Sequence, residues 1–249
     1  MELLRTDRIT KSYPPRLILR DISIHLDEGE LVSLLGLSGS GKTTLLNIMS
    51  GLAAPDSGRV YLSGKDITGQ PGQVSYMLQK DLLLEHKHVI DNVALPLVIR
   101  GMNKKEAREK AAQYFAPFDL AGTEMLYPSQ LSGGMRQRAA LLRTYLGSQG
   151  VILLDEPFSA LDMITRGQLH DWYLNIMEEI GFSTILITHD VDEAIVLSDR
   201  IYLLTGTPGE IRHEIPVDVP RTERQDFNLQ PGFAAIKRQI RDILLTSAV

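Results

Sequence analysis

The chain has no cysteine and few aromatic residues. Its 249 residues include one tryptophan, and aromatic side chains make up 6% of the total. The missing thiols exclude disulfides, thiolate metal sites, iron–sulfur clusters and a cysteine nucleophile. The strongest apolar stretches, Leu31–Leu37, Val151–Leu154 and Ile185–Thr188, are far shorter than the ~20 residues that span a bilayer. We therefore expect contact with a membrane only through a partner.

Charge of neither sign dominates the chain. Lysine and arginine number 26 against 31 acidic residues, which gives a net charge of −5. A polybasic nucleic-acid binder is excluded on this balance, and no nucleic-acid partner is expected. The first residues, Met1–Pro15, carry charged side chains and lack the apolar core of a signal peptide. The chain is therefore expected to remain in the cytoplasm.

The order of patterns along the chain predicts a compact α/β fold. Extended segments are expected at Leu3–Ile9, Leu17–Leu26, Glu30–Leu35 and Gly58–Leu62, and short apolar runs return at 151–154 and 184–188. Apolar runs without alternation are typical of a parallel sheet that is covered on both faces. Between them, helical periodicity from about 91 to 147 predicts a helical insertion.

Further helices are expected on either side of this insertion. One begins near Gly41 and places Leu45, Leu46, Met49 and Leu52 on one face. Another covers Arg166–Ile180. After a polar, proline-bearing stretch at 205–231, a last helix at Phe233–Leu245 has one apolar stripe, which predicts packing against the core.

A glycine-rich segment follows the apolar strand that ends at Leu35. It matches the pattern G-x-x-x-x-G-K-[ST] and immediately precedes a helix, which is the context that a phosphate loop requires. Its backbone N–H groups would surround phosphates, and the following helix would direct its positive end at their charge. A plain glycine-rich turn is the alternative interpretation. The residues predicted to bind nucleotide here are Gly36, Ser38, Gly39, Ser40, Gly41, Lys42, Thr43 and Thr44.

Two adjacent acids, Asp155 and Glu156, follow the apolar strand at 151–154. Ligands bind at the carboxyl ends of strands in open α/β sheets, and acids after a buried strand are unfavourable unless they are used. Asp155 and the Thr43 hydroxyl are therefore predicted to hold Mg²⁺, and Glu156 to polarise an attacking water. Solvated acids at a plain strand end are the alternative.

A third motif selects one family among the phosphate-loop nucleotidases. The segment Leu131–Gln137, LSGGMRQ, resembles the signature of ATP-binding cassette (ABC) proteins, and the order of the other motifs agrees with that family from Leu3 to about Gly209. This resemblance implies a single ABC nucleotide-binding domain at 1–249, with a mixed β-sheet core, an antiparallel β subdomain and a helical subdomain at about 91–147. The tail from about 205 to 249 is too short for an added regulatory domain.

The same resemblance implies roles for four further residues. Tyr13 is similar to the aromatic that stacks on adenine, although a half-buried strand tyrosine is the alternative. Gln79 resembles the glutamine that contacts the metal and the attacking water, and His189 resembles the histidine that contacts the γ-phosphate. Asp162 resembles the acid that crosses the dimer seam, and it is also placed to cap the following helix.

In this family two copies pack head to tail, so each ATP lies between one phosphate loop and the partner's signature. The resemblance therefore implies an ATP-dependent homodimer in which Ser132, Gly133 and Gly134 bind the partner's nucleotide. Many members of the family carry glutamine at the position of Met135. Methionine there resembles importer ATPases of the nitrate, sulfonate and taurine group.

These resemblances imply an ATPase at the cytoplasmic face of the cell membrane, held there by polytopic permease subunits that receive solute from a binding protein. A soluble assembly ATPase and the energising subunit of an export or lipoprotein-release complex are the alternatives. Leu82, Leu83 and Leu84 follow Gln79 closely. They predict either core packing or a groove for a permease helix, and Leu83 is the residue chosen to test the groove.

Overall fold

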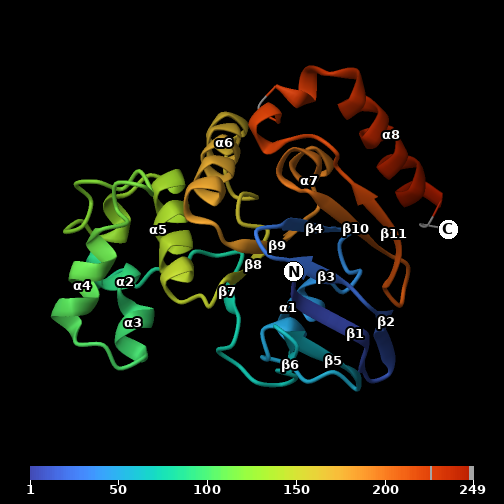
Figure 1. Cartoon of the computed structure of the whole chain (residues 1–249), viewed down its shortest axis with the longest axis horizontal. Helices are drawn as coiled ribbons and strands as arrows, with labels where there is room; N and C mark the ends of the chain where they lie inside the picture. The colour runs from blue at the N-terminus through green and yellow to red at the C-terminus, as the bar shows by residue number, and fades with distance from the viewer. Residues whose placement is uncertain (225, 247–249) are drawn as a thin grey trace.

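Six strands form the central sheet in this computed structural model, which describes residues 1–224 and 226–246. They are β4 (Leu31–Leu35), β7 (Ser75–Met77), β8 (Val151–Asp155), β9 (Ser183–Thr188), β10 (Arg200–Thr205) and β11 (Glu210–Pro216). The order across the sheet is β11-β10-β4-β9-β8-β7 (Figure 1). Only β11 runs antiparallel to its neighbour, so the sheet is mixed, as predicted.

The parallel strands lie at the centre of the molecule because both of their faces are covered. Every residue of β4, β8 and β9 is buried. This agrees with the apolar runs in the sequence, which show no alternation. Their carboxyl ends lie along one edge of the sheet, where the phosphate loop and Asp155 follow.

A second, antiparallel sheet packs below the first in Figure 1. Its strands are β1 (Glu2–Tyr13), β2 (Arg16–Ile22), β3 (His25–Asp27), β5 (Ser57–Leu62) and β6 (Lys65–Asp66). The helix α1 (Lys42–Met49) lies between the two sheets, and its Leu45, Leu46 and Met49 are buried in the core that joins them. The predicted antiparallel subdomain is confirmed.

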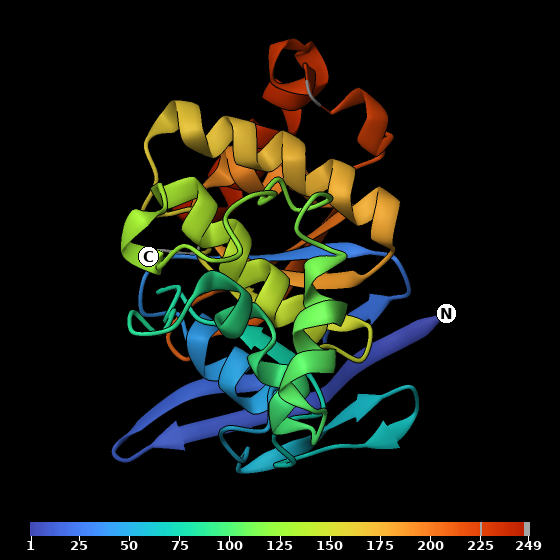
Figure 2. The ribbon, with the colours of Figure 1, turned by 90° about the vertical axis from the view of Figure 1, so that its left-hand side faces the viewer.

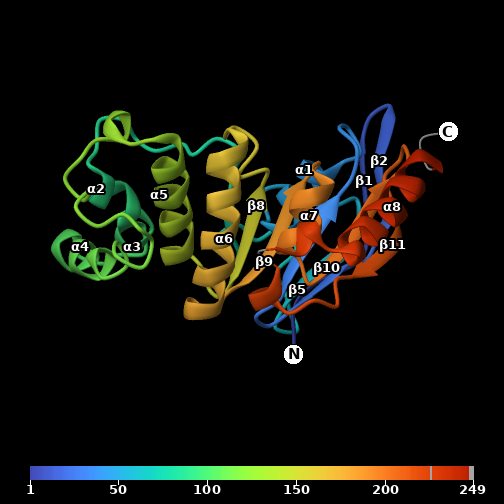
Figure 3. The same ribbon diagram turned by 90° about the horizontal axis from the view of Figure 1, so that it is seen from above.

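The helical insertion forms one end of the molecule (Figures 2 and 3). It comprises α2 (Val89–Val93), α3 (Leu95–Ile99), α4 (Lys104–Ala112) and α5 (Gly133–Leu146), with a short 3₁₀ turn at Pro128–Gln130. Phe115 and Phe118 are buried with residues of β7, β8 and α6 in a single cluster. The insertion is therefore anchored to the sheet by apolar packing.

Three helices cover the other face of the central sheet (Figure 1). They are α6 (Met163–Ile180), α7 (Val191–Leu197) and α8 (Pro231–Thr246), with 3₁₀ turns at Arg221–Glu223 and Phe227–Leu229. Ile240 of α8 is fully buried against residues of α7, β10 and β11. The predicted packing role of the last helix is confirmed. None of the described helices is long and apolar enough to cross a bilayer.

Several predicted boundaries were wrong. The segment at 17–26 is two strands, because residues 23 and 24 interrupt the extended run. The first helix ends at Met49, so Leu52 is exposed, and Gly51 follows in a left-handed conformation with φ +77°. The stretch at 205–231 contains β11, and α7 was not predicted.

Candidate active site

The phosphate-loop segment connects β4 to α1 in a conformation that only glycine permits at several positions. Gly39 and Gly41 have φ values of +84° and +99°. A Cβ atom on Gly36 would lie 2.3 Å from the carbonyl oxygen of Leu204, and one on Gly41 would lie 2.6 Å from Cδ2 of Leu19. No side-chain hydrogen bond caps the first turn of α1. The helix therefore presents its free N–H groups toward the loop, as an anion site requires.

Lys42 is buried and curls back over this loop. Its Nζ donates hydrogen bonds to the carbonyl oxygens of Gly36 at 2.8 Å and Leu37 at 3.0 Å. Burial lowers the pKa of Lys42, and the carboxylates of Glu156 and Asp155 oppose this shift. Phosphate oxygens would offer the ammonium stronger, charge-assisted partners at the same place.

The other loop positions differ in exposure. Ser38 is exposed, Thr44 is half-buried, and Ser40 is buried with no hydrogen-bond partner for its Oγ among the described residues. Buried hydroxyls are normally satisfied. The bare N–H groups fit a loop that holds phosphate oxygens.

Asp155, at the end of β8, receives two hydrogen bonds through its Oδ2. The Thr43 hydroxyl and the Tyr76 hydroxyl each donate to it at 3.2 Å. Burial raises the pKa of Asp155, and these two hydrogen bonds oppose the rise. Tyr76 was not predicted, because a strand tyrosine carries no motif of its own. Burial also raises the pKa of Tyr76 far above its ordinary value, so this hydroxyl remains a donor.

The residues around Asp155 fit Mg²⁺ bound together with a nucleotide. The described part of the chain holds no cluster of three His, Cys, Asp or Glu side chains suited to a metal. Mg²⁺ usually takes one or two protein ligands and completes its shell with water and substrate phosphates. Asp155 and Thr43 supply such a pair of oxygens.

Glu156 brings together three residues that are far apart in the sequence. Its Oε1 lies 3.1 Å from Nδ1 of His189, and its Oε2 accepts a hydrogen bond of 3.3 Å from Nε2 of Gln79. The same amide group lies 3.4 Å from Oγ of Ser159. Gln79, Glu156 and His189 were predicted as site residues from the sequence, and Ser159 was not.

The backbone of Glu156 is itself unusual. Its φ is +47°, a left-handed conformation that few residues other than glycine adopt. Its N–H donates to the carbonyl oxygen of Ile187 at 3.0 Å, and its own carbonyl accepts from Ser159 at 2.9 Å. The neighbouring strand and turn thus hold the conformation, which aims the carboxylate at His189 and Gln79. Such conformations cluster at functional sites.

Tyr13 lies at the turn between β1 and β2. Its side chain is 49% exposed, and Nζ of Lys11 lies 5.3 Å from its ring centroid. One face of the ring is thus covered by a cation, and the exposed remainder is free to stack on a base. The adenine-stacking role stays a prediction.

The signature segment begins α5, far from α1 in the same chain. Ser132 caps this helix, because its Oγ accepts a hydrogen bond from the N–H of Met135 at 3.3 Å. Cβ atoms on Gly133 and Gly134 would lie 3.3 Å from side-chain atoms of α6 and the turn before it. In Figure 3, α6 and β8 stand between α5 and α1. The chain therefore does not bring its two glycine-rich helix starts together.

An ion cluster missed by the sequence analysis ties the segment after Gln79 to α5. Arg136 contacts Asp81 through Nε at 2.9 Å and Glu85 through Nη2 at 2.8 Å. Arg143 donates two further hydrogen bonds, to the carbonyl oxygens of Asp81 and Leu82. The signature helix and the Gln79 segment therefore form a connected unit.

Asp162 caps α6, as the capping interpretation predicted. Its Oδ1 accepts hydrogen bonds from the N–H groups of Ile164 at 3.1 Å and Thr165 at 3.0 Å. Its Oδ2 accepts from the Thr165 hydroxyl at 2.6 Å. These hydrogen bonds lower the pKa of Asp162. The cross-dimer role remains a prediction.

The leucines after Gln79 divide between core and surface. Leu83 is 6% exposed and belongs to the cluster that anchors the helical insertion, whereas Leu82 is 54% exposed. For Leu83 the core interpretation is confirmed, and its choice as the residue to test a docking groove was wrong. Leu82 adopts φ +47°, and this left-handed conformation turns its side chain to the surface.

Comparison with known proteins agrees with this arrangement. Residues 19–159 match the family model described as ABC transporter. The chain is 38% identical to the formylaminopyrimidine import ATP-binding protein of Halalkalibacterium halodurans, over 100% of this chain and 98% of the relative. It is 40% identical to an aliphatic sulfonates import ATP-binding protein of Xanthomonas axonopodis pv. citri, over 94% and 92%.

A solved structure supplies a third likeness. It is the dimeric, post-hydrolysis state of an ATP-binding cassette bound to ADP and phosphate. It superimposes with a TM-score of 0.73 and 29% identity, and the match covers 88% of this chain and 100% of the other. That cassette has the fold described above.

Proposed function

Because this chain belongs to the ABC transporter family, we propose that it is the ATP-hydrolysing subunit of an importer and powers solute uptake through separate membrane subunits. The observation that carries the ATP hydrolysis is the meeting of Gln79, Glu156 and His189 beside the phosphate loop. The family match and the import relatives support the same conclusion. These relatives serve different solutes at similar identity, so we assign no solute.

The geometry suits hydrolysis by an attacking water. Glu156 accepts the proton of this water as its oxygen bonds to the γ-phosphorus and the bond to the ADP oxygen breaks. His189 and Gln79 hold the carboxylate at 3.1 and 3.3 Å, so it is oriented before substrate arrives. Lys42 and the N–H groups of the loop stabilise charge on the β- and γ-phosphates.

Mg²⁺, when bound, neutralises phosphate charge. We propose that the Thr43 hydroxyl, the Asp155 carboxylate and the Gln79 amide oxygen hold it or its water shell. The hydrogen bond between Thr43 and Asp155 already aligns two of these oxygens. The hydrogen bond from Nε2 to Glu156 leaves Oε1 of Gln79 available to the metal.

The placement of the signature supports a head-to-tail homodimer. Ser132, Gly133 and Gly134 begin α5, which α6 and β8 separate from the phosphate loop of the same chain (Figure 3). A second copy, rotated about a two-fold axis, would bring its own signature to this loop. Each ATP would then be enclosed by two chains, so dimerisation would depend on nucleotide.

The surface around Leu82 supports docking of a membrane subunit at the cytoplasmic face of the cell membrane. Leu82 is an exposed apolar residue of the segment that leads to the helical insertion. The Arg136 cluster connects this segment to the signature helix, and Gln79 connects it to Glu156. A cytoplasmic helix of a permease seated here could thus act on both ends of the nucleotide site.

The proposal is tested by affinity purification of the full chain at native expression from gently solubilised membranes, with identification of the partners and an ATPase assay. We expect a polytopic permease and a solute-binding protein to copurify, and Leu82→Glu to reduce their recovery without loss of soluble ATPase activity. Tyr61→Glu, on β5 outside this surface, is the control. Recovery of soluble partners alone, with membrane extraction verified, would overturn the importer assignment in favour of an assembly ATPase. Net export of solute by the reconstituted complex would overturn its direction.

A further inference from the structure

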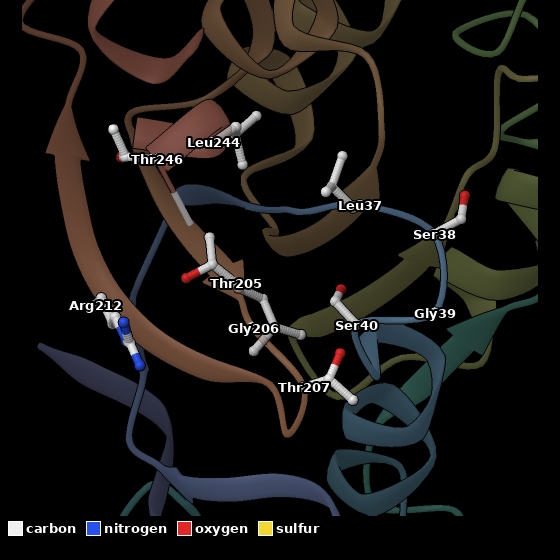
Figure 4. A pocket seen from close by; sticks show the side chains of 11 residues that line it. Leu37, Ser38, Gly39, Ser40, Thr205, Gly206, Thr207, Arg212, Leu244 and Thr246 are labelled. Carbon is white, nitrogen blue, oxygen red and sulfur yellow. The ribbon is translucent and has the colours of Figure 1, made fainter. Parts of the chain in front are cut away.

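A cavity of about 530 Å³ lies behind the phosphate loop. The loop residues Leu37–Ser40 form one side, and Arg212 of β11 lies on the opposite side, with Leu244 of α8 near the top (Figure 4). Lys42 and Asp155 do not line it. The cavity therefore lies on the side of the loop away from Lys42 and Asp155, and it shares Ser38, Gly39 and Ser40 with the predicted phosphate cradle.

Two buried hydroxyls in this cavity have no partner. Ser40 and Thr205 are 6% and 5% exposed, and neither side-chain oxygen makes a hydrogen bond within the described residues. They come from different elements, the phosphate loop and the end of β10. Buried polar groups are normally paired, so two orphaned hydroxyls lining one cavity point to a polar ligand.

Charge selects the class of ligand. Among the residues that the structure describes, Arg212 is the only charged one in the lining. It contacts Glu210 at 3.0 Å, and the same carboxylate lies 3.1 Å from Arg20. Two guanidinium groups thus share one carboxylate, which leaves a net positive charge at this wall. Three leucines supply apolar surface to the rest of the cavity, namely Leu37, Leu204 and Leu244.

We propose that this cavity binds a small organic oxyanion. The anionic group contacts Arg212 and the hydroxyls of Ser40 and Thr205, and a short aliphatic part packs against Leu244. Because Ser40 belongs to the phosphate loop, a ligand held by its hydroxyl changes the affinity of the loop for ATP, and ATP changes the affinity for the ligand by the same factor. This site is separate from the proposed transport function and would exist in an assembly ATPase as well.

The experiment is titration calorimetry of the purified full chain with butane-1-sulfonate, butanoate and butan-1-ol. We expect saturable binding of one anion per chain, no binding of the alcohol, and a shifted ATP affinity when the anion is present. If both anions bind, the cavity is a general oxyanion site. If only one binds, the site is selective for a sulfonate or for a carboxylate group. Lys42→Ala should retain anion binding. Loss of binding in that variant would place the anion in the phosphate cradle and overturn the proposal.

Substitution of the residues that line the cavity tests whether the anion binds there. Arg212→Gln should weaken anion binding at least tenfold, because it removes a charge-assisted contact. Arg20→Gln removes the other cation that contacts Glu210 and should weaken binding by a smaller factor, because Arg212 remains in the cavity. Leu244→Trp should fill the cavity and abolish binding with ATP binding retained. If that variant does not fold, Thr205→Val, which removes an unpaired hydroxyl, replaces it and should weaken binding. Equal anion affinity in Arg212→Gln and the wild type, or no anion binding at all, would overturn the proposal.

Discussion

The N-termini of α1 and α5 are both glycine-rich, but they differ in capping and in the charged residues beside them. At α1 no side chain caps the first turn, and Lys42, Thr43 and Asp155 gather beside it. At α5 the Ser132 hydroxyl already occupies one N–H, and the nearest cation, Arg136, is paired with Asp81 and Glu85. The first start is prepared to hold an anion alone. At the second, the cation is already paired, which suits it to complete a site that another chain holds.

The largest effect is expected from removing the base that activates water at the α1 end. Glu156→Gln should lower kcat for ATP by about 10²–10⁴-fold, because it removes a positioned base, and should leave ATP affinity unchanged. Turnover and equilibrium nucleotide binding measure the two quantities. Glu179→Gln, an exposed acid on α6, is the matched control. Full turnover in Glu156→Gln would exclude this residue as the base.

The next largest effect is expected from removing Lys42, the buried cation at the start of α1. Lys42→Ala should weaken ATP binding by about tenfold to a hundredfold, since charge-assisted hydrogen bonds to phosphate are lost. Fluorescent-nucleotide titration measures the change, and Lys65→Ala on β6 should have none. An unchanged affinity would mean that the N–H groups of the loop suffice and that Lys42 serves the transition state alone.

The sequence predicted the α1 end better than the α5 end for a physical reason. A phosphate loop is local: its glycines, lysine and flanking strand are contiguous, so residues 31–49 carry the whole signal. Glu156 was predicted from its place after a buried strand, Gln79 and His189 were named through the family resemblance, and only the sheet order brings the three together. Tyr76 and Ser159 were missed because single hydroxyls in strands and turns have no pattern.

Tertiary context also accounts for the errors in the fold. The α7 and β10 segments are short, and the turn between them is only two residues, Ser198 and Asp199. Asp199 is tied to Arg221 and Arg224, more than twenty residues further on, which the local sequence could not reveal. Leu82 and Leu83 are identical in chemistry, but Leu82 adopts a left-handed backbone and is exposed, whereas Leu83 is buried.

The α5 end can be changed without unfolding its helix. Ser132→Asp keeps a favourable N-cap residue but places a carboxylate where the partner's phosphate would lie. In a Glu156→Gln background with saturating Mg·ATP, this variant should remain monomeric in sedimentation at concentrations where the parent dimerises. Ser132→Asn is the neutral capping control and should dimerise. Dimerisation of the aspartate variant would show that α5 does not approach the phosphates.

The smallest effect is expected at Asp162, where capping and a cross-dimer role can be told apart. Asp162→Ala should lower the midpoint of thermal unfolding by about 2–4 °C, because α6 loses a side-chain cap in a domain of this size. Asp162→Ser should restore the midpoint, since serine also caps. If capping is the whole role, serine restores the ATPase activity of the dimer as well. If Asp162 also crosses the seam beside the start of α5, serine restores stability but leaves the dimer's ATPase rate at the alanine level.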